Sequence, residues 1–444
     1  MERMKLERLA AFFTELKPED VPAAVQEKAK LCLLDVLECC AQAPEADHRL
    51  KGALASVRHE IGCGNAAVWG AGWRVPAAEA AFVNAVRGSI SYRNDLHRKS
   101  AVHAGAIVCA SALAAAEQSG ASPNQVLLGI IAGYESMIRL GEILAVKGLH
   151  RGFRSSAVCA PFGAAVACGK VWGLSEREMI SAASFSCHSG AGNNEWACAG
   201  TGEDVFHAGW GARNGLQAAQ LAASGAVGCA SGLEGKNGML ACFDALDGLQ
   251  LLTQELGRQY KILEVEHKPI AACLMLQAPC QAAERIAQQE GFSPDAITKI
   301  EITVSAQARR QPGCDAPTAE NLVQAKMNLR YGVIQSLLGV TSCWKPPDAQ
   351  MKKLMERCVV REDHAFTALF PQKTAALVRV TAGERVFEDE EADFAPLQPE
   401  QVEARYHSAC KSWLGPEREA QLFHAVKHFE QLSDITQLTA LLKR

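Results

Sequence analysis

Residues 104–120 have the sequence AGAIVCASALAAAEQSG, and this stretch indicates the class of the fold. Ala, Leu and Gln favour helix, and Gly120 is the residue type that most often ends one. The run is apolar on every side, as expected of a helix inside a protein. Its small side chains let neighbouring helices approach closely. The stretch therefore predicts a helix over 104–118 within a tightly packed helical bundle.

Similar patterns flank this stretch and extend the helical prediction to about the first 260 residues. Residues 20–38 carry apolar side chains at helical spacing, and Asp20 is the expected N-cap. Ser122 is the expected cap of a helix that runs over 126–143. Helices of the same composition are predicted at 156–173, 176–186 and 208–224.

The pattern changes after Val265. Residues 297–304 alternate between apolar and polar, which predicts a strand, and 375–388 predict a hairpin with Gly383 in its turn. Helices are expected at 278–290, 328–338 and 398–442. We therefore predict a mainly α fold with two domains, an all-helical one (1–265 with 396–444) and a smaller α+β lid (266–395). A cleft between domains is the usual place for a small-molecule site.

Charge and composition exclude several classes of protein. The net charge of −4 and the pI of about 6.3 argue against a nucleic-acid partner. The sequence contains neither a secretory signal nor an apolar run of membrane-spanning length, so we expect no membrane association and a cytoplasmic location. The 17 cysteines include no CxxC pair, which predicts reduced thiols, no iron–sulfur cluster and no metal site.

The strongest candidate for chemistry is the segment 92–103, YRNDLHRKSAVH. It holds two histidines, one aspartate and three cations directly before the apolar helix. His103 would lie near the N-terminus of that helix, where the positive helix end favours the neutral imidazole that a general base needs. A solvated polar loop is the alternative interpretation.

Three further segments are weaker candidates. Residues 148–156 contain Arg151 and Arg154 together with Gly148 and Gly152, which allow tight turns, and arginine binds carboxylates through two hydrogen bonds. Residues 186–207 form a polar, glycine-rich insertion that could be a mobile site loop. Residues 265–273 place Lys268 at the expected domain junction. For each, a structural role is the alternative, and neither a zinc site nor a Cys187–His188 thiol nucleophile fits the spacing of 186–207.

Several ordered motifs together carry a family resemblance. In chain order they are 20–35, the helix after His103, IAGYE (131–135) with Arg139, RGF (151–153), FGAA (162–165), HAGW (207–210), RNG (213–215), LEG (233–235) and Lys268-Pro269 with Cys273. In this set the chain resembles the MmgE/PrpD family, which includes 2-methylcitrate dehydratase, cis-aconitate decarboxylase and iminodisuccinate epimerase. The resemblance implies a helical domain with an α+β lid, a homodimer, a site in the cleft and no metal or organic cofactor.

The resemblance also implies roles for particular residues. It makes His103 the site histidine and matches Lys268 and Tyr331 to the catalytic lysine and tyrosine of the lid. Three positions depart from the family pattern, because Arg93 replaces an aspartate, Arg154 a histidine and Asp204 a lysine of the decarboxylase-like members. This exchange of charges predicts a ligand that differs in shape or charge from methylcitrate and cis-aconitate.

The sequence thus predicts a lyase, either a dehydratase or a decarboxylase, for a small anionic di- or tricarboxylate. His103 would move a proton beside a carboxylate, and Lys268 or Tyr331 would assist. The expected substrate-binding residues are Arg93, Asp95, His97, Arg154, Asp204 and His207. Two alternatives remain open at this point, namely an epimerase or isomerase in the same fold and a carboxylate-binding protein without catalytic activity.

Overall fold

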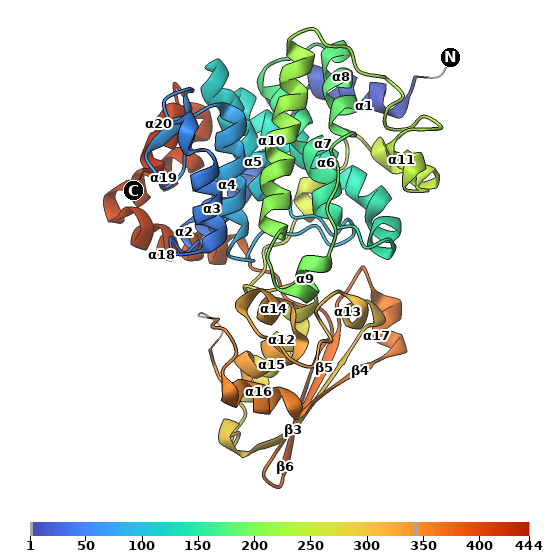
Figure 1. Cartoon of the computed structure of the whole chain (residues 1–444), viewed down its shortest axis with the longest axis vertical. Coiled ribbons are helices and arrows are strands. Elements are labelled where there is room, and N and C mark those ends of the chain that lie inside the picture. Colours follow the sequence, from blue (N-terminus) through green and yellow to red (C-terminus); the bar gives the residue numbers. More distant parts are fainter. Residues whose placement is uncertain (1–2, 341–343, 444) are drawn as a thin grey trace. The chain divides into compact units, whose positions relative to one another are not determined.

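Helix α5 (Gly105–Ser119) lies in the interior of a helical unit, as its apolar sequence predicts (Figure 1). A computed structural model describes residues 3–340 and 344–443 of the chain. α5 packs against α4 (Ala77–Ser89) and α7 (Ser155–Val171), and it ends at Gly120, whose φ of 71° is left-handed. The predicted helix and its stop signal are therefore confirmed.

The chain divides into two compact units. The first comprises residues 1–193, 204–267 and 398–444, and the second comprises 194–203 and 268–397. The second unit therefore includes the short segment 194–203. From the sequence, we expected this segment to belong to the helical domain.

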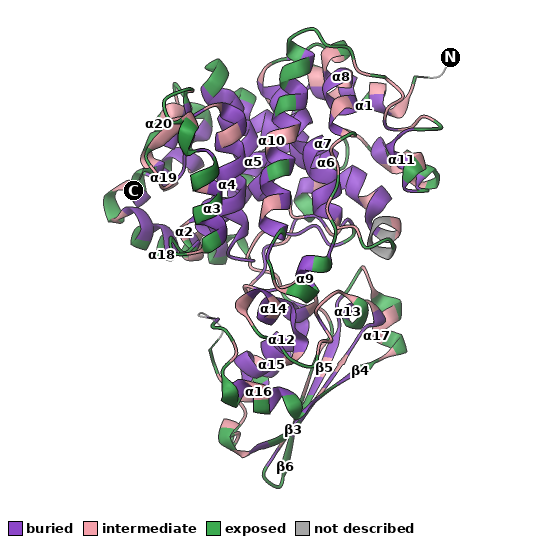
Figure 2. Cartoon of the chain, viewed as in Figure 1, coloured by how far each residue is buried: buried purple, intermediate pink, exposed green. Residues whose placement is uncertain are grey.

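The first unit is helical apart from a small hairpin, and its inner helices are buried along most of their length (Figure 2). Helix α10 packs on α4, α7 and α8, and the C-terminal helix α18 packs on α2. The remaining elements are α1 (Lys5–Glu15), α2 (Ala23–Ala41), α3 (His48–Ser56), β1 (Ala66–Val68), β2 (Trp73–Val75), α6 (Pro123–His150), α8 (Glu176–Ser186), α10 (Asp204–Ala223), α11 (Met239–Cys242), α18 (Pro399–Leu414), α19 (Pro416–Lys427) and α20 (Thr436–Thr439).

Two helix starts differ from the prediction. Asp20 does not cap α2, because it ends a 3-10 turn (Pro18–Asp20) in which its carboxylate accepts a hydrogen bond from Lys17 N–H. Helix α10 begins at Asp204 rather than at residue 208. A carboxylate in the first turn of a helix is favoured by the helix dipole. Asp204 and His207 therefore lie on a helix and not in the predicted polar loop.

The second unit is built on a four-stranded sheet of order β4-β3-β5-β6. The predicted strand is β3 (Ile297–Val304), and the predicted hairpin is β5 (Ala376–Ala382) with β6 (Arg385–Glu391), joined through Gly383 at φ 60°. β4 (Cys358–Glu362) was not predicted, because it is short and its sequence CVVRE lacks a clear alternation. The helices of this unit are α9 (Glu195–Ala199), α12 (Gln277–Ala287), α13 (Ala306–Arg310), α14 (Leu322–Met327), α15 (Leu329–Leu337), α16 (Ala349–Glu356) and α17 (His364–Leu369).

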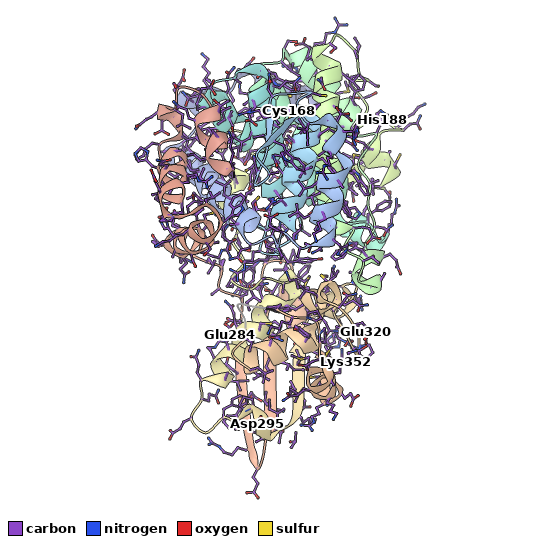
Figure 3. All side chains as sticks on the ribbon, turned by 60° about the vertical axis from the view of Figure 1, so that its left-hand side comes forward. Cys168, His188, Glu284, Asp295, Glu320 and Lys352 are labelled. Atoms are coloured by element: carbon purple, nitrogen blue, oxygen red, sulfur yellow. The ribbon has the colours of Figure 1, made fainter. Side chains whose placement is uncertain are left out.

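Cysteines in this fold serve mainly as small core residues. Cys168 on α7 lies deep among the helices (Figure 3), and its thiol approaches Ser111 O at 3.6 Å. Burial raises the pKa of Cys168 far above its usual range, so the thiol is inert. Within the described ranges, all cysteines are present as thiols. None of the described helices is both long enough and apolar enough to cross a membrane.

A buried ion pair on α6 fixes the long irregular segment that follows α11. Arg139 lies 3.2 Å from the Glu135 carboxylate and donates to the carbonyls of Leu251, Gln254 and Gln259. Burial raises the pKa of Glu135 to about 7, although Arg139 opposes this shift. Both side chains are fully buried, and Glu135 also accepts from Ile262 N–H at 3.0 Å, so each charge depends on the other for its compensation.

We predict that Arg139→Met destabilises the first unit by about 3–5 kcal/mol, because Glu135 and three carbonyls lose their donor. Urea unfolding followed by circular dichroism measures this loss. The matched control on the same helix is Lys147→Met, which removes a largely exposed pair with Asp247 and should cost less than about 1 kcal/mol. Equal losses in the two variants would contradict a special role for the buried pair.

Candidate active site

The segment 92–103 begins and ends in strained backbone. Tyr92 and Ala101 are non-glycine residues with φ of 64° and 52°. Such conformations cost about 1–3 kcal/mol each and cluster at functional sites. His97 N–H donates to Val102 O at 3.0 Å, which closes the segment into a loop. The loop delivers His103 to the start of α5.

His103 is held at a ring nitrogen and at its main chain. Its Nδ1 lies 2.7 Å from the main-chain carbonyl of Asp95, and its main-chain N–H donates to Ser156 Oγ at 3.0 Å. A carbonyl only accepts hydrogen bonds, so Nδ1 must carry the proton. In the neutral ring the lone pair is then on Nε2, which is the nitrogen that can accept a proton.

Asp95 orients the histidine through its own side chain as well. One carboxylate oxygen accepts from Gly105 N–H at 3.1 Å, and the other accepts from the Tyr134 hydroxyl at 2.7 Å. The side chain is fully buried, and burial, followed by the nearby Asp35 charge, raises the pKa of Asp95 to about 6. Asp95 therefore fixes both the imidazole of His103 and the first turn of α5, which begins two residues after His103.

The N-terminus of α7 lies next to His103, because Ser156 in its first turn accepts a hydrogen bond from His103 N–H. Arg154 is the residue before the helix, and its guanidinium donates to the carbonyl of Asp204 at 2.8 Å. The Asp204 carboxylate accepts from the Tyr92 hydroxyl at 3.1 Å. Burial raises the pKa of Asp204, although the positive charges of Arg154 and Arg49 oppose this shift. Arg154 and Asp204, two positions that depart from the family pattern, thus contact each other.

His207 joins the same group from α10. Its ring is so close to Gly192 that a Cβ there would lie 3.1 Å from ring atoms, and Gly192 O accepts from Arg154 N–H at 2.9 Å. The first unit therefore holds most of the predicted site residues, namely Arg93, Asp95, His103, Arg154, Asp204 and His207, and its hydrogen bonds connect Asp95 with His103 and Arg154 with Asp204.

Arg93 faces a buried carboxylate. Its guanidinium lies 3.5 Å from Glu38, which is fully buried on α2. Arg405 on α18 approaches the other Glu38 oxygen at 3.4 Å. Burial raises the pKa of Glu38, and the two arginines oppose that shift. Glu38 thus supplies a negative charge next to Arg93, the arginine that the resemblance aligns with an aspartate of the family.

His97 points toward a different cluster. Its Nδ1 lies 2.8 Å from Ser100 Oγ, and its Nε2 lies 3.6 Å from Glu264 and 3.9 Å from Glu142. One possible ligand atom from each of these three side chains lies within 4.8 Å of the others, but Lys261 lies 2.9 Å from Glu142 and supplies a positive charge there. The role of His97 in substrate binding stays a prediction.

The second unit holds the two remaining catalytic candidates. Lys268 is buried, and its ammonium donates to Ala272 O at 3.3 Å. Tyr331 on α15 is also buried, donates its hydroxyl to Lys345 O, and accepts from Gln335 at 2.8 Å. Their catalytic roles stay predictions.

Cys187 and His188 do not form a reactive pair. His188 projects from the surface (Figure 3), whereas the Cys187 thiol points back to Ala183 O at 3.3 Å. Burial raises the pKa of Cys187 to about 12, so no thiolate forms near neutral pH. The structure agrees with the sequence argument against a thiol nucleophile.

Four residues of the site were not predicted as site residues, namely Asp35, Glu38, Tyr134 and Ser156. Tyr134 and Asp35 lie in motifs that carry the family resemblance, but a motif does not say which buried groups a side chain reaches. Ser156 follows Arg154 by two residues, so its place in the first turn of a helix could have been inferred. Glu38 gave no signal, because it lies within an ordinary helical pattern.

The chain belongs to the MmgE/PrpD family. The N-terminal domain of that family matches residues 7–251, and the C-terminal domain matches residues 270–431. This confirms the mainly α fold with a smaller α+β domain.

Two fungal proteins illustrate the relationship. A cis-aconitate decarboxylase-like protein of Aspergillus oryzae is 28% identical over 315 residues, which are 67% of this chain and 65% of the relative. A cis-aconitate decarboxylase of Aspergillus terreus is 27% identical over 305 residues, which are 65% of this chain and 61% of the relative. The match thus spans somewhat less than two thirds of each relative.

The raised pKa of Asp95, about 6 against about 3.9 when unfolded, predicts a pH-dependent stability. The folded state binds this proton more tightly, so the contribution is complete below pH ~4 and is lost as the pH rises through ~6. Asp95→Asn imitates the protonated side chain. The unfolding free energy of wild type relative to this variant should therefore fall by up to about 3 kcal/mol between pH ~4 and ~6.

The control for this titration is Asp434→Asn. Hydrogen bonds from Thr436 lower the pKa of Asp434, so its stabilising contribution should be complete above pH ~4 and be lost as the pH falls below ~4, opposite to that of Asp95. Chemical denaturation at several pH values measures both differences. A difference between wild type and Asp95→Asn that does not vary with pH would disprove the buried titration.

Gly105→Ala should damage the support of His103. A Cβ there would lie 2.7 Å from the Tyr134 hydroxyl oxygen and 3.1 Å from the Asp95 carboxylate, closer than a methyl group can pack. We expect a loss of about 1–3 kcal/mol in the unfolding free energy. At Gly52 in α3 nothing lies within 4 Å, so Gly52→Ala should be neutral or stabilising by up to about 1 kcal/mol. Similar effects of the two changes would refute the close contact.

Proposed function

We propose that this protein is a cofactor-independent lyase that acts on a small di- or tricarboxylate, with decarboxylation the favoured reaction. The observation that carries the proposal is the bond between His103 Nδ1 and Asp95 O, because it fixes the tautomer and leaves Nε2 to exchange a proton with a ligand. The names of the two Aspergillus relatives favour a decarboxylase over a dehydratase.

The proposed chemistry needs one proton at a fixed place. In decarboxylation, the bond between a carbon atom and its carboxyl group breaks and carbon dioxide leaves. The electron pair of the broken bond stays with the remaining unsaturated acid, at the carbon that lost the carboxyl group. Protonated His103 then donates its Nε2 proton to that carbon. In dehydration, neutral His103 would instead remove a proton next to a carboxylate, while hydroxide leaves with a proton from a second acid. Lys268 and Tyr331 are the proposed second acids.

Binding of the substrate's carboxylates is assigned to cations around His103. Arg154 stands at the positive end of α7, which itself favours an anion. Arg93 lies in the loop 92–103 that ends at His103, and its guanidinium is 3.5 Å from the Glu38 carboxylate. Anchored arginines lose little conformational freedom on binding, so they stabilise developing negative charge effectively. Lys268 is proposed as a third cation.

We predict that His103→Gln lowers kcat by about 10²–10⁴-fold while the circular dichroism spectrum and melting temperature stay close to wild type. Candidate substrates are first selected by thermal shift from di- and tricarboxylates, including amino-dicarboxylates, and turnover is then followed by NMR in deuterated water. The control is His188→Gln, which changes an exposed histidine and should leave turnover unaltered.

The NMR products also separate this proposal from its rivals. Release of carbon dioxide or water supports the lyase. Deuterium entering a substrate that is otherwise unchanged would instead show an epimerase or isomerase. Thermal stabilisation by a carboxylate without any product would show a binding protein, and full activity of His103→Gln would refute the assignment of His103 as the group that transfers the proton.

A further inference from the structure

We propose that Asp35 is a positioning residue. Its carboxylate accepts a hydrogen bond from the main chain of Asp95 and thereby sets the orientation of His103. The inference rests on the proposed function for its catalytic consequence, but the geometry that supports it is independent of any substrate. All the groups involved lie in the first unit of the chain.

The first step is the contact between Asp35 and the loop. One carboxylate oxygen of Asp35 accepts a hydrogen bond from Asp95 N–H at 3.1 Å. The carbonyl of that same Asp95 accepts from His103 Nδ1 at 2.7 Å. A movement of Asp95 relative to α2 therefore moves the acceptor that defines the imidazole's orientation. Asp35 is 1% exposed, so water cannot replace it cheaply at this point.

The second step is that other groups fix Asp35 itself. Its second oxygen accepts from the Arg405 guanidinium on α18 and lies 3.2 Å from His267 Nδ1. The other ring nitrogen of His267 lies 3.2 Å from the Lys28 ammonium. An ammonium can only donate, so His267 Nε2 accepts and Nδ1 carries the proton that faces Asp35. Burial lowers the pKa of His267, which keeps this ring neutral.

The third step is that the peptide after Asp95 is also restrained. Leu96 N–H donates to Glu266 O at 2.8 Å, and Glu266 N–H donates to Leu96 O at 2.7 Å. Glu266 is held in turn by two hydrogen bonds from Arg98. Glu266 thus binds the main chain of Leu96, and His267 lies beside Asp35, so both contact groups that position Asp95. The next residue in the chain is Lys268. Asp35, on α2, therefore contacts Arg405 of α18, His267 of the segment 266–267 and Asp95 of the loop 92–103.

The charge of Asp35 is needed because its carboxylate faces donors on both sides. Asp95 N–H approaches one oxygen, and Arg405 and His267 approach the other. An asparagine offers only one oxygen, so its NH2 group must face a donor on one side in either orientation. Asp35→Asn should therefore loosen the Asp95 main chain or release Arg405 and His267.

The experiment compares Asp35→Asn with Glu117→Gln. Glu117 is a matched control, because it is a buried carboxylate of the same unit that accepts from one main-chain N–H (Ala67) and from an arginine (Arg74). Its hydrogen bonds lead to β1 and to Thr439, not to His103. The primary measurement is NMR of protein labelled with ¹⁵N-histidine, in which the ring nitrogen shifts report the tautomer, and His103→Gln assigns the signal.

We expect Asp35→Asn to change the tautomer balance or the ring shifts of His103, and Glu117→Gln to leave them as in wild type although it also lowers the melting temperature. With a substrate, kcat should fall ~10-fold or more in Asp35→Asn while KM changes little. A His103 signal that is unaltered in Asp35→Asn overturns the proposal. If no carboxylate is turned over by wild type, the proposed function fails, but the NMR comparison still decides the role of Asp35.

A milder variant covers the case in which Asp35→Asn does not fold. Arg405→Lys keeps the positive charge but removes the guanidinium fork that holds Asp35. It should shift the His103 signal in the same direction and by a smaller amount. Unchanged His103 shifts in folded Arg405→Lys, together with failure of Asp35→Asn to fold, would show that Asp35 has a structural role only.

Discussion

The hydrogen bonds of Asp95 are the interaction on which the candidate site depends. Its main chain binds Asp35 and His103, and its carboxylate binds Gly105 and Tyr134. A buried carboxylate without partners would cost several kcal/mol, so it is stable only when these donors are all in place. Helices α2, α5 and α6 must therefore be packed correctly before the imidazole has a defined orientation. Folding of the bundle and construction of the site are the same event.

Close helix packing makes that arrangement possible. Gly105 lets the Tyr134 hydroxyl and the Asp95 carboxylate approach the start of α5, and no other residue type leaves this space. Alanine, glycine and cysteine supply the same closeness elsewhere in the bundle. The polar groups of the site are thus embedded in a dense apolar core, where hydrogen bonds are strong and side chains move little.

Charges around His103 come in compensated groups. Arg93 and Arg405 share Glu38, and Arg154 donates to the main-chain carbonyl of Asp204, whose carboxylate accepts from the Tyr92 hydroxyl. Two of the three departures from the family pattern, Arg154 and Asp204, are therefore structurally linked, and the third, Arg93, has its own buried partner. Replacing Arg154 would remove one of the positive charges that oppose the raised pKa of the buried Asp204, whereas Glu38 would keep Arg405 if Arg93 were replaced.

The sequence by itself determined the helical character of the first unit, the strand 297–304, the hairpin at Gly383 and the choice of the segment 92–103. Those features follow from local spacing of apolar residues and from turn residues, which act over a few positions. Only the tertiary structure decided that Asp35 and Tyr134 bind Asp95, that Ser156 binds the main chain of His103, and that His97, six residues earlier, faces Glu142 and Glu264 instead. Partners 39 to 60 residues apart are chosen by the packing of helices, and no local pattern records that choice.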